Sequence, residues 1–104
     1  MKPKILSWNI WGLNDPNRRF QVKNLLRHGK MDIVCLQEIK LNFIDRSIIT
    51  SLWGCPFVGW VYLASNAVSG GILIMWDRRV VESIGEYTGN YTVVWFKNVV
   101  GGFS

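Results

Sequence analysis

Two polar side chains stand at the ends of two short apolar runs, where together they could hold a metal ion. Asn9 lies near the end of residues 4–10, and Glu38 ends residues 32–38. A carboxylate at the end of a buried strand is costly unless it is paired or metal-bound, and Mg²⁺ takes one or two carboxylates while it keeps several waters. The ordinary alternatives are that Glu38 pairs with Lys40 or is solvated, and that the Asn9 amide hydrogen-bonds a turn. The positions of these residues in the sequence favour the ordinary alternatives. Their spacing therefore makes Asn9 and Glu38 no more than a candidate catalytic and metal-binding pair.

One amphipathic helix between the two runs would bring their ends together. Residues 4–10 and 32–37 have the β-branched and apolar residues of strands. Asp15-Pro16 predicts a helix start, because Asp is a good N-cap and proline fits the first helical position, and Gly29 predicts its end. In a strand–helix–strand unit the carboxyl ends of both strands lie at one edge of the sheet, where ligand sites collect. The apolar stripe expected on this helix comprises Phe20, Val22, Leu25 and Leu26.

The remainder of the chain predicts one more helix and four strands. The helix covers residues 42–53, with Gly54 as its stop, and short spacings between the later strands favour antiparallel hairpins. We therefore expect one α/β domain, in which a strand–helix–strand unit, a helix and an antiparallel meander form a mixed β-sheet with helices on one face. The four later strands are expected at residues 57–63, 70–76, 79–86 and 91–96.

Composition narrows the class of protein. Of 104 residues 49% are hydrophobic and 18% are charged, which excludes a disordered chain. The net charge of +5 favours a polyanionic partner, although the basic residues of the first helix read more simply as a solvated face. No apolar run reaches membrane-spanning length, and we expect no signal peptide. Cys35 and Cys55 are too few and too separated for a disulfide scaffold, and Cys35 is expected to be a buried free thiol. We expect an intracellular location and no membrane partner.

Three segments carry a resemblance to a known family. Residues 5–14 and 33–40, which contain Asn9 and Glu38, resemble the first two motifs of the endonuclease/exonuclease/phosphatase superfamily. The helix between them and residues 69–77, which contain Gly70-Gly71, look like the branch carried by LINE-type (non-LTR) retrotransposons, particularly those of plants. The resemblance covers nearly the whole chain.

The resemblance implies a four-layer α/β sandwich, of which this chain would form the first half, and a metal-dependent hydrolase. The residue matching Glu38 would bind Mg²⁺, with Mn²⁺ as an alternative, and the residue matching Asn9 would help build that site. Water would attack phosphorus in line, with the metal stabilising charge on the phosphoryl and leaving oxygens. The LINE-type branch nicks chromosomal DNA in the nucleus, and the free 3′ end primes the reverse transcriptase of the same polyprotein.

The chain also departs from the family pattern. Trp11 stands where other branches carry an acidic or a basic residue, and Ile39 replaces a usual Thr. The later motifs, which supply a Tyr, an Asp-x-Asn pair and an Asp-His pair, do not occur after Phe96. We therefore expect a partial domain that is inactive alone and self-associates through an uncovered apolar sheet face. The alternatives are a non-catalytic remnant that binds nucleic acid or protein, and a phosphatase or exonuclease of the same superfamily.

Overall fold

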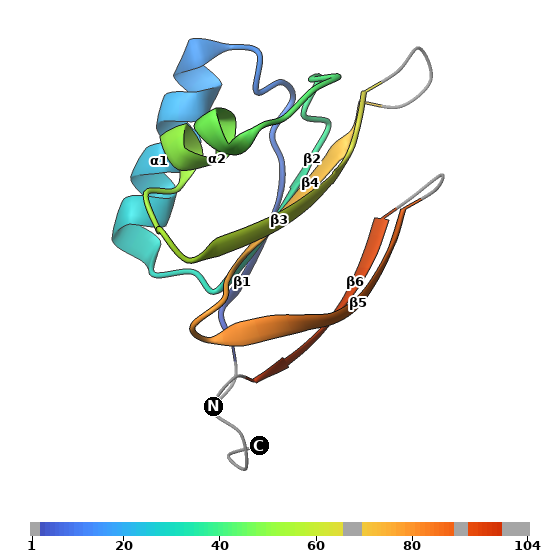
Figure 1. Ribbon diagram of the computed structural model, residues 1–104. Coiled ribbons are helices and arrows are strands. Elements are labelled where there is room, and N and C mark those ends of the chain that lie inside the picture. The colour runs from blue at the N-terminus through green and yellow to red at the C-terminus, as the bar shows by residue number, and fades with distance from the viewer. Residues whose placement is uncertain (1–2, 66–69, 89–91, 99–104) are drawn as a thin grey trace.

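The computed structural model describes residues 3–65, 70–88 and 92–98, which form two strand–helix units followed by four strands. Figure 1 shows helices α1 and α2 together on one side of a four-stranded sheet, with the β5–β6 hairpin on the other side. None of these helices has the length and apolar character needed to span a bilayer, as far as the described residues go. The elements are β1 (Ile5–Asn9), α1 (Pro16–Gly29), β2 (Ile33–Gln37), α2 (Arg46–Leu52), β3 (Val58–Leu63), β4 (Ile72–Asp77), β5 (Val81–Thr88) and β6 (Thr92–Asn98).

The larger sheet is mixed, with the strand order β1-β2-β4-β3. β1 and β2 are parallel and α1 connects them, whereas β4 runs antiparallel to both of its neighbours, β2 and β3. The carboxyl ends of β1 and β2 therefore share one edge of the sheet with the amino end of β4. The predicted mixed sheet with helices on one face is confirmed (Figure 1).

Aspartate caps set where both helices begin. The Asp15 side chain accepts a hydrogen bond from the Asn17 backbone N–H at 2.9 Å, which confirms the predicted start of α1. α1 ends at Gly29, as predicted, and Lys30 after it adopts the left-handed conformation expected beyond a helix end. The second helix is shorter than predicted: because Asp45 caps it by accepting from the Ile48 N–H at 3.0 Å, residues 42–45 precede it as a loop.

The main core lies between the helices and the sheet. From α1, Val22 and Leu26 are buried in this core, but Phe20 is 62% exposed and Leu25 is 37% exposed. The predicted apolar stripe is therefore wrong for Phe20, because two residues of α-helix turn the chain by roughly 200° and place Phe20 and Val22 on opposite sides. From the sheet and loops the core takes Ile10, Leu13, Val34, Leu36, Ile39, Ile44, Ile49, Leu52, Trp53, Val58, Leu73 and Met75.

The predicted continuous meander breaks between β4 and β5, where the chain changes sheets. β3 and β4 form one antiparallel pair and β5 and β6 form another, in a separate two-stranded sheet. The turn after β4 is tight, because Asp77 accepts hydrogen bonds from the backbone N–H groups of Arg79 and Val80. Val81 then packs with Ile74 and Trp76 on the sheet face opposite the helices. Of the strand predicted over residues 91–96, Tyr91 lies outside the described residues.

Candidate functional site

Asn9 lies at the end of β1, directly beside the end of β2. The strand register pairs Asn9 with Gln37, and the Ile10 N–H donates to the Gln37 carbonyl at 2.9 Å. Trp8 packs against the helix-side core, so alternation along the strand places Asn9 on the opposite face, where its side chain is exposed. The predicted meeting of the two strand ends is confirmed, whereas the chemical roles of Asn9 and Glu38 stay predictions.

Glu38 follows β2 in a left-handed backbone conformation, with φ of 56°. This conformation interrupts the alternation of side chains along the strand, so Ile39 and not Glu38 enters the helix-side core after Leu36. The Glu38 side chain keeps 34% of its surface exposed. The apolar Ile39, which departs from the family pattern, is fully buried. The carboxylate is thus kept out of the core and held at the sheet edge.

Gly70 and Gly71 form one wall of this edge. The backbone N–H of Lys40 donates to the Gly70 carbonyl at 2.7 Å, and that of Ile39 to the Gly71 carbonyl at 3.4 Å. A Cβ atom on Gly70 would overlap Glu38 Oε2 and lie 2.6 Å from Cδ, so only glycine leaves the carboxylate its place. Two adjacent glycines permit such a close backbone approach. The sequence gave no partner for them, because Gly70 and Glu38 are far apart along the chain.

Lys40 and Trp11 complete the edge. The Lys40 ammonium lies 3.2 Å from Glu38 Oε2 and 5.7 Å from the centre of the Trp11 ring. The pairing of Glu38 with Lys40, expected as the ordinary alternative, is therefore present. Both side chains of the pair are partly exposed, so the pair contributes at most about 1 kcal/mol to stability. Trp11 is 63% exposed at the rim.

Strained backbone is concentrated at this edge. Trp11, Glu38 and Lys40 are three of the four non-glycine residues with positive φ in the described ranges, and the fourth is Lys30 beyond α1. Each such residue costs about 1 kcal/mol or more unless it is held in place, and such residues cluster at functional sites. The strain points to this edge as the candidate site.

The oxygen donors at this edge suit a hard cation, but those of the described residues are too few to enclose one. Glu38 offers a carboxylate and Asn9 an amide oxygen, and Mg²⁺ binds one or two carboxylates and otherwise keeps water. The space that Gly70 leaves around Glu38 Oε2 keeps the carboxylate in position for such a contact. Within the described ranges, however, no group of three or more His, Cys, Asp or Glu side chains gathers into a metal cage. Glu38 would be the first ligand of any metal held here.

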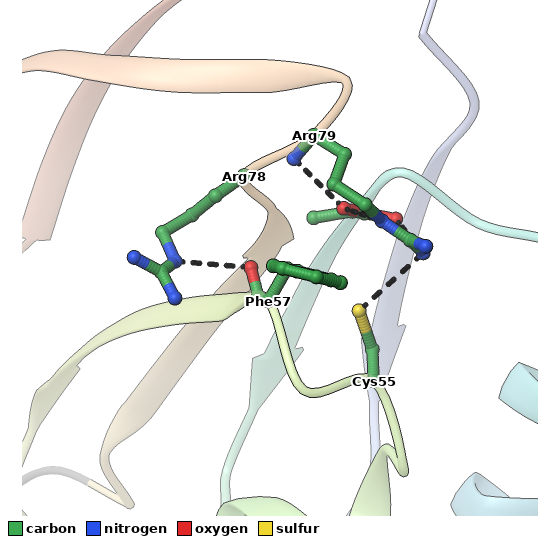
Figure 2. Close-up of polar contacts among 5 residues, drawn as sticks. Cys55, Phe57, Arg78 and Arg79 are labelled. Carbon is green, nitrogen blue, oxygen red and sulfur yellow. Dashed lines mark hydrogen bonds and ion pairs between the residues drawn. The ribbon is translucent and has the colours of Figure 1, made fainter.

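A second polar cluster, at the opposite edge of the sheet, was not predicted as such (Figure 2). Asp77 is 7% exposed and accepts hydrogen bonds from Arg79 Nε at 3.1 Å and Nη2 at 2.9 Å. These bonds to the Arg79 guanidinium lower the pKa of the Asp77 carboxyl. The Arg79 guanidinium also contacts Cys55 Sγ at 3.7 Å and lies 4.9 Å from the Phe57 ring centre. The cluster ties the β4–β5 turn to the start of β3.

Cysteine and histidine offer no second candidate site. Cys35 and Cys55 are free thiols. Cys35 is half-buried where a buried thiol was predicted, and burial raises the pKa of this thiol. His28 Nδ1 lies 2.8 Å from the Asn24 carbonyl in the last turns of α1. Because α1 runs from the Asn9 edge back to the start of β2, His28 lies toward the far edge of the sheet. It does not reach Glu38.

Comparison with solved structures shows the fold. The AP endonuclease LMAP from Leishmania major shares 20% identity, with a TM-score of 0.57 over 78% of this chain and 27% of that chain. The catalytic domain of Xenopus laevis APE2 shares 24% identity, with a TM-score of 0.55 over 82% of this chain and 26% of that chain. The chain spans about a quarter of the length of these two structures.

Comparison of the sequence shows the family. No curated protein matches the chain. The model of the Endonuclease/Exonuclease/phosphatase family matches residues 6–103, which include both strand ends and the glycine pair. The chain therefore belongs to the endonuclease/exonuclease/phosphatase family.

Proposed function

We propose that this chain contributes the metal-binding edge of a phosphodiesterase that cleaves DNA, with Glu38 as metal ligand and Asn9 as a neighbouring polar contact. The observation that carries the proposal is the left-handed Glu38, whose carboxylate is seated against Gly70 at the edge where β1 ends with Asn9. The family is generally dependent on divalent metals. The net charge of +5 suits a polyanionic substrate.

Each residue of the edge has a distinct role in this proposal. Glu38 would hold Mg²⁺, or Mn²⁺ as the alternative, which when bound would stabilise charge on the phosphoryl and leaving oxygens. Asn9 would orient the carboxylate or a bound water through its amide. Lys40 balances the Glu38 charge in the free chain at 3.2 Å and would have to move or share that oxygen once a cation binds.

Metal binding is tested by titrating Mn²⁺ into the chain and measuring free Mn²⁺ by electron paramagnetic resonance. Glu38→Gln should remove the binding, because it replaces the charged ligand by a neutral amide of the same shape. Glu82→Gln makes the same change in β5, away from the edge, and should leave the binding intact. Equal binding by both variants would rule out Glu38 as the ligand.

We infer further that these residues alone do not cleave DNA. Hydrolysis needs a group that activates water, and His28, the one histidine of the chain, bonds the α1 backbone away from Glu38. Of the family motifs that supply a Tyr, an Asp-x-Asn pair and an Asp-His pair, none occurs after Phe96. Monomeric 104-residue protein should leave supercoiled plasmid uncut with Mg²⁺; nicking that EDTA stops would contradict the inference.

The narrower biological role rests on resemblance. Residues 69–77 and the α1 segment look like those of LINE-type retrotransposons, and Gly70 of that segment packs against Glu38. The parent activity would then be a nick in nuclear DNA that primes a reverse transcriptase of the same polyprotein. The test is the genomic sequence after Ser104: an in-frame continuation should carry the missing motifs and a reverse transcriptase. A frame that continues into an unrelated domain would refute this role.

Self-association is part of the proposal. On the face opposite the helices, β1 leaves Ile5 64% exposed, with Ser7 exposed beside it. β1 is an edge strand of the four-stranded sheet, and an exposed edge strand with an open apolar side chain favours pairing between copies. Sedimentation equilibrium should give a mass that rises with concentration, and Ile5→Lys should lower it toward the monomer. A monomer at every concentration would exclude self-association.

A further inference from the structure

A groove runs along the contact between α1 and α2, apart from the candidate metal site. It consists of two hollows that adjoin at Lys23. The larger, of about 400 Å³, reaches Arg27 and is lined by the buried Leu26 and Trp53. The smaller, of about 270 Å³, reaches Arg19 and Phe20. We call the two hollows together the α1–α2 groove; it shares no residue with the edge at Asn9 and Glu38.

Three cations follow this groove in a column. Arg19, Lys23 and Arg27 are spaced four residues apart on α1, so each lies about 6 Å further along the helix axis on the same face. The two ion pairs within the described ranges, Lys40–Glu38 and Arg79–Asp77, do not involve them. The helix itself, residues 16–29, contains no Asp or Glu. The groove therefore presents positive charge that no carboxylate of the described residues neutralises.

The acidic residues nearest in sequence are used elsewhere. Asp15 and Asp45 cap the two helices through backbone N–H groups, and Asp32 accepts from the Lys4 N–H at 2.8 Å. None of them lines either hollow. A solvated helix face usually mixes charges of both signs. A single-sign column beside a hollow is instead suited to a polyanion.

An aromatic ring stands beside this column, at the smaller hollow. Phe20 is 62% exposed, follows Arg19 directly and lines the smaller hollow. Surfaces that bind single-stranded nucleic acid combine a positive groove for the backbone with exposed rings on which bases stack. A base inside a duplex is already stacked on its neighbours and cannot reach such a ring.

We propose that the α1–α2 groove binds single-stranded nucleic acid, with successive phosphates on Arg19, Lys23 and Arg27 and one base stacked on Phe20. The groove is independent of the candidate metal site. It would recognise the charge of the nucleic-acid backbone and the flat face of a base. Sequence preference is therefore expected to be weak and salt dependence strong.

The test is fluorescence anisotropy with labelled oligo(dT), oligo(U) and the oligo(dT)·oligo(dA) duplex over a range of salt. Replacing Arg19, Lys23 and Arg27 together by Gln should weaken binding of the single strand. It should also reduce the salt slope, the steepness with which the logarithm of the binding constant falls with the logarithm of salt concentration, by about 2, because each of the three lost phosphate contacts contributes about 0.7. The matched control replaces Lys4, Arg18 and Lys30 by Gln, which removes the same charge outside the groove. Its slope should stay near that of the natural chain.

The stacking contact is tested separately. Phe20→Leu should weaken single-strand binding about fivefold or more, since base–aromatic stacking contributes that much. Phe43→Leu alters a ring that is also 62% exposed but lies outside the groove, and should change nothing. Preference for oligo(dT) or oligo(U) would identify the sugar that is bound. Equal slopes in the two triple variants, or duplex binding as tight as single-strand binding with no effect of Phe20→Leu, would overturn the proposal. Glu38→Gln should leave this binding intact, which separates it from the metal site.

Discussion

Replacing Gly70 by alanine perturbs the candidate site through a single added atom. The new Cβ would overlap Glu38 Oε2, lie 2.6 Å from its Cδ and approach its Cα to 3.0 Å. The backbone at Gly70 is not in the left-handed region, so alanine introduces no conformational strain of its own. The expected effect therefore comes from displacement of the Glu38 carboxylate.

The size of this effect can be worked from the contacts. Overpacking costs typically about 1–3 kcal/mol, and the lower part of that range applies because a carboxylate that is 34% exposed can swing into solvent. Leaving Lys40 at 3.2 Å forfeits up to about 1 kcal/mol. Replacing glycine returns about 0.4–1 kcal/mol by restricting the unfolded chain. We expect Gly70→Ala to lower the free energy of unfolding by about 0.5–2 kcal/mol, within the combined range of these effects.

A double-mutant cycle with urea unfolding isolates the contact. In a Glu38→Ala background the overlapping oxygen and Cδ are gone and only the 3.0 Å approach to the backbone Cα of residue 38 is left. Gly70→Ala should therefore cost less there, with a coupling of about 1–2 kcal/mol, within the range for residues in contact. Gly54→Ala is the control, because no atom lies within 4 Å of its added Cβ, and it should be neutral or stabilising. If Gly70→Ala cost the same with and without Glu38, the proposed seating of the carboxylate would be wrong.

Two further predictions concern charge. Lys40→Met should raise Mn²⁺ affinity up to about fivefold, because it removes an ammonium that lies 3.2 Å from the proposed ligand oxygen. This partly exposed ion pair is worth at most about 1 kcal/mol, which sets the limit on the gain. Unchanged affinity would mean that Lys40 does not compete with the metal. Asp77→Asn should lower the free energy of unfolding by about 1.5–3 kcal/mol at neutral pH, the usual contribution of hydrogen bonds to charged groups. Arg79 lowers the pKa of Asp77 in the folded chain. The contribution of Asp77 to the free energy of unfolding is therefore complete above its pKa in the unfolded chain, about 3.9, and is lost as pH falls through its pKa in the folded chain. Urea unfolding across acidic pH should therefore show the two proteins converging; a difference that persists at the lowest pH would contradict this role.

Local sequence signals predicted the first half of the fold well. Asp15-Pro16 fixes the start of α1, and the apolar runs on either side pair as the parallel strands β1 and β2. The meeting of Asn9 with the end of β2 follows from that unit alone. These features depend on residues near one another in sequence.

The features that were missed depend on contacts between distant segments. The left-handed conformation of Glu38 arises where Ile39 enters the core and Lys40 bonds Gly70, and no local pattern in residues 32–40 encodes it. The change of sheet after Asp77 likewise requires the buried contact of Val81 with residues of β2 and β4. The prediction of the buried face of α1 was wrong for a different reason. Phe20 was included in the apolar stripe for its composition, although helical geometry turns it away from Val22.

The candidate edge is held by backbone and core contacts, and the charge of Glu38 contributes little to it. Leu13 and Ile39 are fully buried on either side, and the Leu13 N–H donates to the Ile39 carbonyl at 2.7 Å, which joins the two loops that follow β1 and β2. The Lys40 N–H to the Gly70 carbonyl adds the third segment. Because these contacts do not involve the carboxylate, Glu38→Gln removes a proposed metal ligand and one partly exposed ion pair while the edge persists. A loss of metal binding in that variant can therefore be attributed to the ligand and not to unfolding.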